Sequence, residues 1–164
     1  MPVHLEPVTT HNYAYMCALC KELHGLGTMS HIEFDDSYNR AVIHTHMTNP
    51  VWFMMLARDM DGVEYVGAMA GHVQASMFSQ RMMAFEQGLY VRKGTRYRGS
   101  IALALVRAFM RWCYDTHDCA MIQAGDVASI ESIAVDALYR HAGFRRYGAI
   151  YNHEPHYDAR EGTV

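Results

Sequence analysis

Four cationic side chains cluster in one short segment of the chain: Arg92, Lys93, Arg96 and Arg98. An apolar run ends just before them at Val91, and from Ile101 onward apolar residues recur at helical spacing. The cations therefore lie between a predicted strand and the start of a predicted helix. A helix N-terminus carries unpaired N–H groups and a partial positive charge, so by itself it disfavours cations. The pattern predicts an anion held between the cations and the amides, as in a phosphate cradle.

Two common phosphate-binding motifs do not fit this segment. The nucleotide P-loop, Gly-x-x-x-x-Gly-Lys-Ser/Thr, is absent, and the dinucleotide fingerprint needs three glycines where only Gly94 and Gly99 occur. Residues 97–105, Tyr-Arg-Gly-Ser-Ile-Ala-Leu-Ala-Leu, instead resemble the pyrophosphate loop of the GCN5-related N-acetyltransferase (GNAT) family, usually Arg/Gln-x-x-Gly-x-Gly/Ala after a strand. Counting from Arg96 puts Gly99 in place and Ile101 where the family has Gly or Ala. The Arg-Gly-Ser version is similar to phage-type members.

A second segment strengthens the resemblance. Residues 137–148, Ala-Leu-Tyr-Arg-His-Ala-Gly-Phe-Arg-Arg-Tyr-Gly, resemble the late aromatic-x-x-x-Gly-Phe signature of the same family. Gly143 suits the position that follows a helix, and Arg140 and His141 stand in its last turn, where cations are favourable. The two motifs follow each other in the family's order and spacing, so the chain is identified as resembling a GNAT protein over its whole length.

The periodicity predicts elements in the same order. Strands are expected over 3–9, 52–57, 63–77, 82–91, 120–124 and 145–152, and helices over 11–24 (with Thr10 as N-cap), about 35–46, 99–116 and 129–141. The order β-αα-βββ-α-β-α-β is that of the GNAT fold, an α/β fold with a mixed, mostly antiparallel central sheet flanked by helices. One domain is expected over 1–152, followed by a polar tail over 153–164.

Composition excludes several classes of protein. The chain has 164 residues, of which 51% are apolar, so it can bury a core and is not a disordered protein. A formal net charge of −3 argues against a nucleic-acid partner, and no apolar run reaches the roughly 18 residues that span a bilayer. The first residues do not resemble a signal peptide. We therefore expect no membrane partner and a cytoplasmic location: the host cytoplasm if the protein is phage-encoded, with virion association left open.

The resemblance implies acetyl-CoA as the donor, bound where two central strands separate. The backbone of the strand that follows Gly88 would pair with the pantetheine arm, through Leu89, Tyr90 and Val91. The pyrophosphate would lie on the loop and first helical turn, at Arg96, Arg98, Gly99, Ser100, Ile101 and Ala102. Ser132 stands where many members of the family place an Asn that contacts CoA. The alternative is that the loop has only a structural role, as an ordinary strand-to-helix connection with solvated arginines.

Two residues are candidates for the proton transfers of amine acetylation. Glu86 is the candidate base, because family members often place a carboxylate on this strand, and strand alternation puts it on one face with Gly88 and Tyr90. The alternative is a salt bridge or a solvated strand end. Tyr139 matches the family's tyrosine near the thioester sulfur, where a phenol can donate a proton. Its alternative is a core aromatic packed on Phe144.

No metal site is expected. Cys17 and Cys20 form a C-x-x-C pair inside a predicted helix without a second pair nearby, so buried free thiols are preferred. The close histidine pairs, at 44 and 46 and at 153 and 156, lack the carboxylate or histidine partners of a zinc enzyme.

The sequence thus predicts an acetyl-CoA-dependent N-acetyltransferase that acts on a primary amine of a small molecule or protein, and it is compatible with a homodimer. One alternative is a catalytically silent GNAT fold serving as a structural or binding module, for instance in a phage particle. Another is transfer of a different acyl group. The acceptor is not specified: Asp35 and Asp36 could attract a cationic amine or could simply favour a helix N-terminus.

Overall fold

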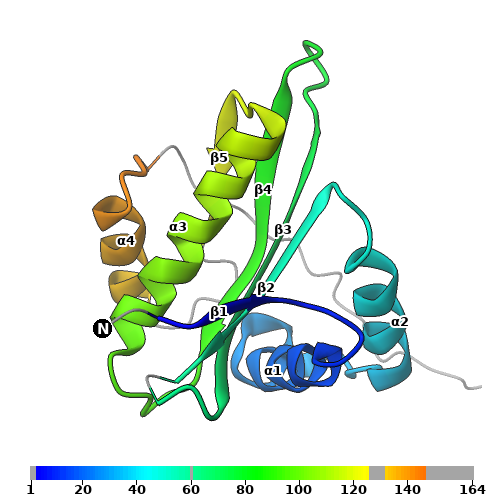
Figure 1. Cartoon of the computed structure of the whole chain (residues 1–164), viewed down its shortest axis with the longest axis vertical. Helices are drawn as coiled ribbons and strands as arrows, with labels where there is room; N and C mark the ends of the chain where they lie inside the picture. The colour runs from blue at the N-terminus through cyan, green and yellow to red at the C-terminus, as the bar shows by residue number, and fades with distance from the viewer. Residues whose placement is uncertain (1–2, 60, 126–131, 147–164) are drawn as a thin grey trace, which may run out of the picture.

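The computed structural model describes residues 3–59, 61–125 and 132–146 (Figure 1). Over these residues the chain forms β1 (Leu5–Pro7), α1 (Tyr13–Leu26), a short 3₁₀ helix (Thr28–His31), α2 (Asp36–His46), β2 (Trp52–Arg58), β3 (Tyr65–Ala75), β4 (Met82–Val91), α3 (Arg98–His117), β5 (Met121–Gln123) and α4 (Ser132–His141). The predicted order of elements is confirmed as far as α4. The predicted strand 145–152 and the tail 153–164 lie almost entirely outside the described residues.

The strands form one sheet in the order β1-β2-β3-β4-β5. The first four are antiparallel to their neighbours, and β5 is parallel to β4 because the chain crosses over through α3. This is the mixed, mostly antiparallel sheet expected from the sequence, so the predicted fold class is confirmed.

Helices cover both faces of the sheet (Figure 1). On one face α3 packs through apolar residues at helical spacing, among them Ile101, Leu105 and Phe109, which are fully buried. Tyr139 of α4 belongs to the same core cluster. On the other face α1 and α2 bury Cys17, Leu19 and Ile43. We call these the α3/α4 face and the α1/α2 face.

A close contact between α3 and β3 depends on a glycine. A Cβ atom built on Gly71 would lie 2.5 Å from Cε2 of Phe109 and 2.9 Å from the carbonyl oxygen of Phe85. Both distances are shorter than van der Waals contact. The missing side chain therefore lets the Phe109 ring rest directly on the strand, which sets how closely α3 approaches the sheet.

The start of α1 differs from the sequence prediction. Thr10 was expected as N-cap, but the helix begins at Tyr13 and Asn12 occupies the cap position. The Asn12 side chain turns back: its Oδ1 accepts from the Thr9 amide at 2.7 Å and its Nδ2 donates to the Pro7 carbonyl at 3.1 Å. The Asn12 side chain therefore closes the turn between β1 and α1, and the helix begins at Tyr13 rather than directly after Thr10.

A bulge in β4 overturns the predicted alternation of its side chains. Ala70 pairs with Gly88 and Gly71 pairs with Glu86, so Gln87 is an extra residue in the ladder. As a result Glu86 faces α4, whereas Gly88 faces Leu23 of α1. The prediction that Glu86, Gly88 and Tyr90 share one face is therefore wrong, because period-two alternation holds only within an unbroken strand.

Candidate active site

β4 loses its partner on one side near the bulge. β5 pairs with β4 only at Met83, Ala84 and Phe85, whereas β3 pairs with it as far as Val91. Among the described residues, no strand therefore pairs with the β5-side edge of β4 beyond Phe85. This edge contains three residues predicted to line the pantetheine arm: Leu89, Tyr90 and Val91. An extended chain with amide groups can pair with such an edge.

The two predicted proton-transfer residues meet where this gap begins. The Tyr139 hydroxyl donates to Oε2 of Glu86 at 3.1 Å, and the backbone N–H of Gly125 donates to the same oxygen at 3.1 Å. Glu86 is half-buried and Tyr139 is 9% exposed. Glu86 thus links β4 to α4 and to the segment that follows β5. The Tyr139 ring also packs edge-on against Phe144 with centroids 5.3 Å apart, as the core-aromatic alternative expects, and its role as a proton donor stays a prediction.

The loop before α3 has the backbone features of an anion cradle. Gly94 and Tyr97 have positive φ angles of 82° and 58°, and Tyr97 precedes the first helical residue without any side-chain cap. A left-handed residue next to helical ones can turn successive N–H groups toward a common point; in this structure the amides of Arg98, Ser100 and Ile101 donate to the carbonyls of Thr95 and Tyr97. A Cβ atom at Gly99 would meet no atom within 4 Å, so there is room for a ligand above the first turn. Phosphate fits such a site.

The predicted loop cations separate into two groups. Arg98 folds back so that its Nε donates to the Val91 carbonyl at 2.9 Å, and the Arg96 guanidinium lies over the Tyr97 ring. Both stay at the cradle. Arg92, however, turns to the α1/α2 face, where it binds Glu22. The expectation that all four cations surround one anion is therefore wrong, because the Arg92 guanidinium is paired with the Glu22 carboxylate of α1.

Glu22 is a partner that the sequence did not reveal. Its carboxylate accepts from Arg92 Nε at 2.9 Å and from the Arg92 terminal nitrogen at 2.6 Å, and the Tyr90 hydroxyl approaches it at 3.4 Å. The Arg92 hydrogen bonds hold the pKa of the Glu22 carboxyl below its usual range. Burial and the nearby Glu22 charge raise the pKa of Tyr90. The pair joins α1 to the base of the loop.

The remaining residues that were predicted to bind the cofactor have different surroundings. Ile101 and Ala102 point into the core, and the amides of Ser100 and Ile101 both donate to the Tyr97 carbonyl, at 2.9 and 3.1 Å. Ile101 therefore does not obstruct the loop, although the family places Gly or Ala there. Ser132 is the first residue of α4.

The acidic residues near α2 have structural partners. Asp35 is the N-cap and accepts from the Tyr38 amide at 2.8 Å. Asp36 forms an ion pair with Arg40 at 2.6 Å, one turn further along. Of the two interpretations of these acids, the helix N-terminus is the one that their contacts support.

The C-x-x-C cysteines lie inside α1 as free thiols. Burial raises the pKa of both, that of Cys20 to about 11, and a protonated thiol is a poor metal ligand. Over the described residues no group of three or more Cys, His, Asp or Glu side chains is arranged to hold a metal ion. His44 packs edge-on against Tyr13, and His153 and His156 lie outside the described residues.

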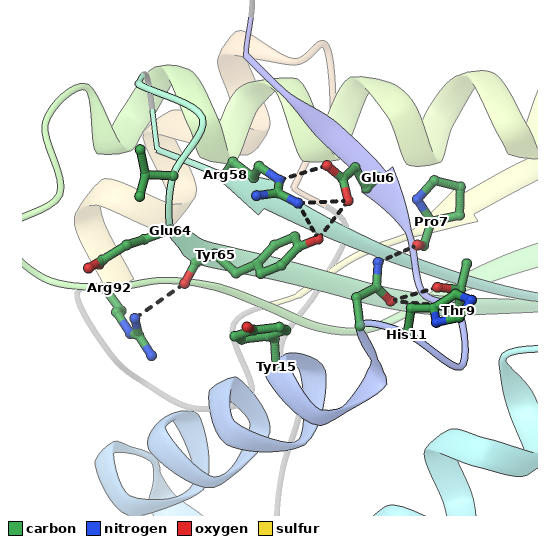
Figure 2. Close-up of a pocket in the computed structure, with 11 residues that line it drawn as sticks. Glu6, Pro7, Thr9, His11, Tyr15, Arg58, Glu64, Tyr65 and Arg92 are labelled. Carbon is green, nitrogen blue, oxygen red and sulfur yellow. Dashed lines mark hydrogen bonds and ion pairs between the residues drawn. The ribbon is translucent and has the colours of Figure 1, made fainter.

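A hollow of about 770 Å³ opens elsewhere, between the start of α1 and the sheet (Figure 2). Arg58 binds Glu6 there at 2.6 Å, and the Tyr65 hydroxyl donates to the same carboxylate at 2.6 Å. Arg58 and Tyr65 hold the pKa of Glu6 below its usual range. Its lining contains none of the residues assigned to acetyl-CoA or to proton transfer.

Comparison with known proteins identifies the fold. No protein-family model matches the sequence, and no curated protein is similar to it. Solved structures are similar: AAC(6′)-Iy in complex with the bisubstrate analogue CoA-S-monomethyl-acetylneamine has a TM-score of 0.75 and 16% identity over 94% of this chain and 98% of that one. An aminoglycoside acetyltransferase from an uncultured soil metagenomic sample has a TM-score of 0.68 and 21% identity over 94% and 99%. Glucosamine-6-phosphate N-acetyltransferase from Arabidopsis thaliana has a TM-score of 0.72 and 9% identity over 94% and 99%.

The chain therefore has the GNAT fold, as the two sequence motifs predicted. At identities this low the similarity shows the fold, but it does not show the substrate. In the part of the chain that the structure describes, no helix is both long and apolar enough to cross a bilayer.

Proposed function

We propose that the protein is an N-acetyltransferase that moves an acetyl group from acetyl-CoA to a primary amine. The observation that carries this proposal is the hydrogen bond between Tyr139 and Glu86 at the place where β4 and β5 part. A phenol and a carboxylate in contact beside an unpaired strand edge form a proton-transfer pair next to a slot for an extended amide chain.

The chain's residues fit acetyl-CoA. The backbone around Tyr97 and the open space above Gly99 suit its pyrophosphate, with Arg96 and Arg98 as nearby cations. The unpaired edge of β4 suits its pantetheine arm. When bound, the donor would supply an acetyl thioester, whose carbonyl carbon is open to attack by a neutral amine.

In this proposal Tyr139 completes the transfer. As the carbon–sulfur bond breaks, its hydroxyl gives a proton to the departing thiolate, and a proton released by the acetylated nitrogen restores the phenol. The nitrogen of an ammonium loses two protons overall, of which one ends on the CoA thiol and the other in solvent. Glu86 holds the phenol in place through Oε2. The expectation that Glu86 also takes the amine's proton stays a prediction, and it requires the amine to reach this carboxylate on the α3/α4 face.

A catalytically silent module is the second candidate. The sequence favoured it through Ile101, which stands where the family has a small residue. That argument is weakened because the Ile101 side chain is fully buried in the core and leaves the loop clear. The acyl group could also differ from acetyl, which the width of the pocket near the thioester would decide.

The test is calorimetry with the full chain and acetyl-CoA, followed by a thiol-release screen over primary amines. We expect saturable binding and release of CoA thiol with at least one amine. Absence of binding at millimolar acetyl-CoA would refute the enzyme, and binding without turnover on any amine or with any acyl-CoA would favour the silent module.

A further inference from the structure

A row of aromatic rings crosses the α1/α2 face of the sheet. The rings come from α2, β2, β3 and β4 in turn: His46, Trp52, His72 and Phe85. Successive centroids are 3.9, 5.0 and 5.4 Å apart, and the first and last pairs are stacked nearly parallel. All four side chains are half-buried, so part of the row reaches the surface. The transfer chemistry proposed above assigns no role to these rings.

The row lies beside the bulge in β4. His72 pairs in register with Phe85, and the Nε2 atom of the exposed Gln87 is 3.2 Å from Nδ1 of His72. Gln87 is the extra residue of the bulge, and its neighbour Glu86 faces the opposite side of the sheet. The bulge thus separates the Glu86–Tyr139 pair on the α3/α4 face from the Gln87–His72 pair on the α1/α2 face.

The two faces suit the two substrates of the proposed reaction. The cradle at the start of α3 and the Tyr139 hydroxyl both belong to the α3/α4 face, so the donor and its leaving sulfur would occupy that face. An amine can reach the same carbonyl carbon past the bulge from the other side. On that side, close to Gln87, it would meet the rings of Phe85 and His72.

The chemistry of this row selects a kind of amine. Aromatic faces bind flat or apolar groups, and an ammonium is attracted to the face of an indole or phenyl ring. Gln87 is neutral, and the two acids considered for the acceptor, Asp35 and Asp36, are occupied by the Tyr38 amide and Arg40. A single amine attached to a planar or apolar group fits this surface better than a polycation, which would need several carboxylates.

His72 is placed to take the amine's proton. The Gln87 amide nitrogen lies against Nδ1; a half-turn of the amide brings its oxygen there instead, where it accepts from Nδ1–H and leaves the lone pair on Nε2 of the ring. In that arrangement Gln87 holds the ring through Nδ1–H both before and after Nε2 accepts a proton. Imidazole is the side chain that exchanges protons near neutral pH. In contrast, Oε2 of Glu86 already accepts from Tyr139 and Gly125.

We propose that the ring row is the acceptor subsite, that it takes primary amines carrying a planar or apolar group, and that His72 accepts the ammonium proton directly or through one water. The inference rests on the proposed N-acetyltransferase function. His72 lies between Trp52 of β2 and Phe85 of β4, with the neutral Gln87 at its Nδ1. The other titratable ring in the row is His46 of α2, on the far side of Trp52.

Binding can be measured without turnover. In a Trp112→Phe variant Trp52 is the sole tryptophan, so its fluorescence reports on the row. With CoA present, which carries no acetyl group to transfer, 2-phenylethylamine should change this fluorescence saturably, and ethanolamine and kanamycin should do so only at concentrations at least tenfold higher. Equal midpoints for the three amines, or no change with 2-phenylethylamine, would overturn the subsite.

The proton role is tested by thiol release with 2-phenylethylamine as a function of pH. For the wild type, kcat/KM should rise with pH and then level off. For His72→Asn it should be about 100-fold lower at pH 7 and should keep rising with pH, because solvent must then supply the neutral amine. Gln87→Glu should retain more activity than Gln87→Leu, and His44→Asn, outside the row, should match the wild type.

Acetyl-CoA calorimetry on the same variants separates the two proposals. If acetyl-CoA fails to bind the wild type, the proposed function fails. If acetyl-CoA binds and any amine is acetylated with the same pH profile in His72→Asn as in the wild type, the transferase stands and the role of His72 is refuted.

Discussion

Tyr139 of α4 and Glu86 of β4, 53 residues apart in the chain, share a hydrogen bond of 3.1 Å where the central sheet begins to separate. The bond unites a carboxylate and a phenol that sequence motifs had placed in separate roles. Because the two residues are in contact, a substitution at either one alters the surroundings of the other, and the effects of the two substitutions should not be additive.

Removing the Tyr139 hydroxyl should slow the chemical step. Tyr139→Phe keeps the ring against Phe144, so kcat should fall roughly tenfold to a thousandfold while the Kd for acetyl-CoA changes little. Steady-state kinetics with calorimetry checks this. Tyr114→Phe, on an exposed part of α3, is the matched control. An unchanged kcat in Tyr139→Phe would show that Tyr139 serves only as a core aromatic.

Closing the space above the first turn of α3 should weaken acetyl-CoA binding. A side chain at Gly99 would meet no protein atom within 4 Å, so Gly99→Val should fold and still hinder a ligand at the loop. Wild-type protein at 100 times the Kd should gain about 2.7 kcal/mol, seen as a higher Tm, and the variant should gain less at the same concentration. Gly25→Val, also in open space, is the control. If acetyl-CoA raises the Tm of both variants equally, the ligand does not bind at this loop.

The ion pair between Glu22 and Arg92 should make stability depend on pH at the acid end. The pKa of Glu22 is lowered in the folded protein, chiefly by hydrogen bonds from Arg92, so its contribution is present above the unfolded-state pKa of about 4.3. That contribution is lost as the pH falls through the folded-state value. The Tm of Glu22→Gln should therefore lie below that of the wild type at pH 7, and the two should converge below about pH 4.

A control for this ion pair is available on α2. Asp36→Asn breaks an exposed pair with Arg40, which should change the Tm little at any pH. If the difference between wild type and Glu22→Gln stays constant from pH 7 to pH 3, the carboxylate of Glu22 is not the source of the stabilisation.

The contact between Gly71 and Phe109 should resist a single added methyl group. Gly71→Ala should lower the free energy of unfolding by about 1–3 kcal/mol in urea denaturation, because its Cβ would lie 2.5 Å from the ring. Gly25→Ala, in α1 and in open space, should instead be neutral or stabilising. The double variant Gly71→Ala with Phe109→Leu should recover part of the loss; a loss independent of residue 109 would place its cause elsewhere.

Cys17 and Cys20 should hold no metal. Burial raises the pKa of both thiols, so elemental analysis of the purified protein should find zinc far below one equivalent. Near-stoichiometric zinc that disappears in Cys20→Ser would show that the C-x-x-C pair is a ligand set after all.

The sequence alone was sufficient for the fold class and for the order of the elements as far as α4. Helical spacing after Ile101, the glycines of the basic loop and the Tyr139 motif are local patterns, and local patterns reflect backbone preferences and the period of burial. They indicated the GNAT fold before any coordinates. They also led to Tyr139 through its motif, and to Glu86 because members of the family often place a carboxylate on this strand.

Only the tertiary structure decided which face each side chain serves. One extra residue, Gln87, separates Glu86 from Gly88, and such a bulge depends on pairing with β3 rather than on local sequence. Arg92 leaves the cradle because Glu22, 70 residues away in the chain, is there to bind it. The ring row likewise assembles from four different elements. Contacts between distant residues carry no local signal, so the direction of Glu86, the destination of Arg92 and the surroundings of His72 emerge only once the sheet has formed.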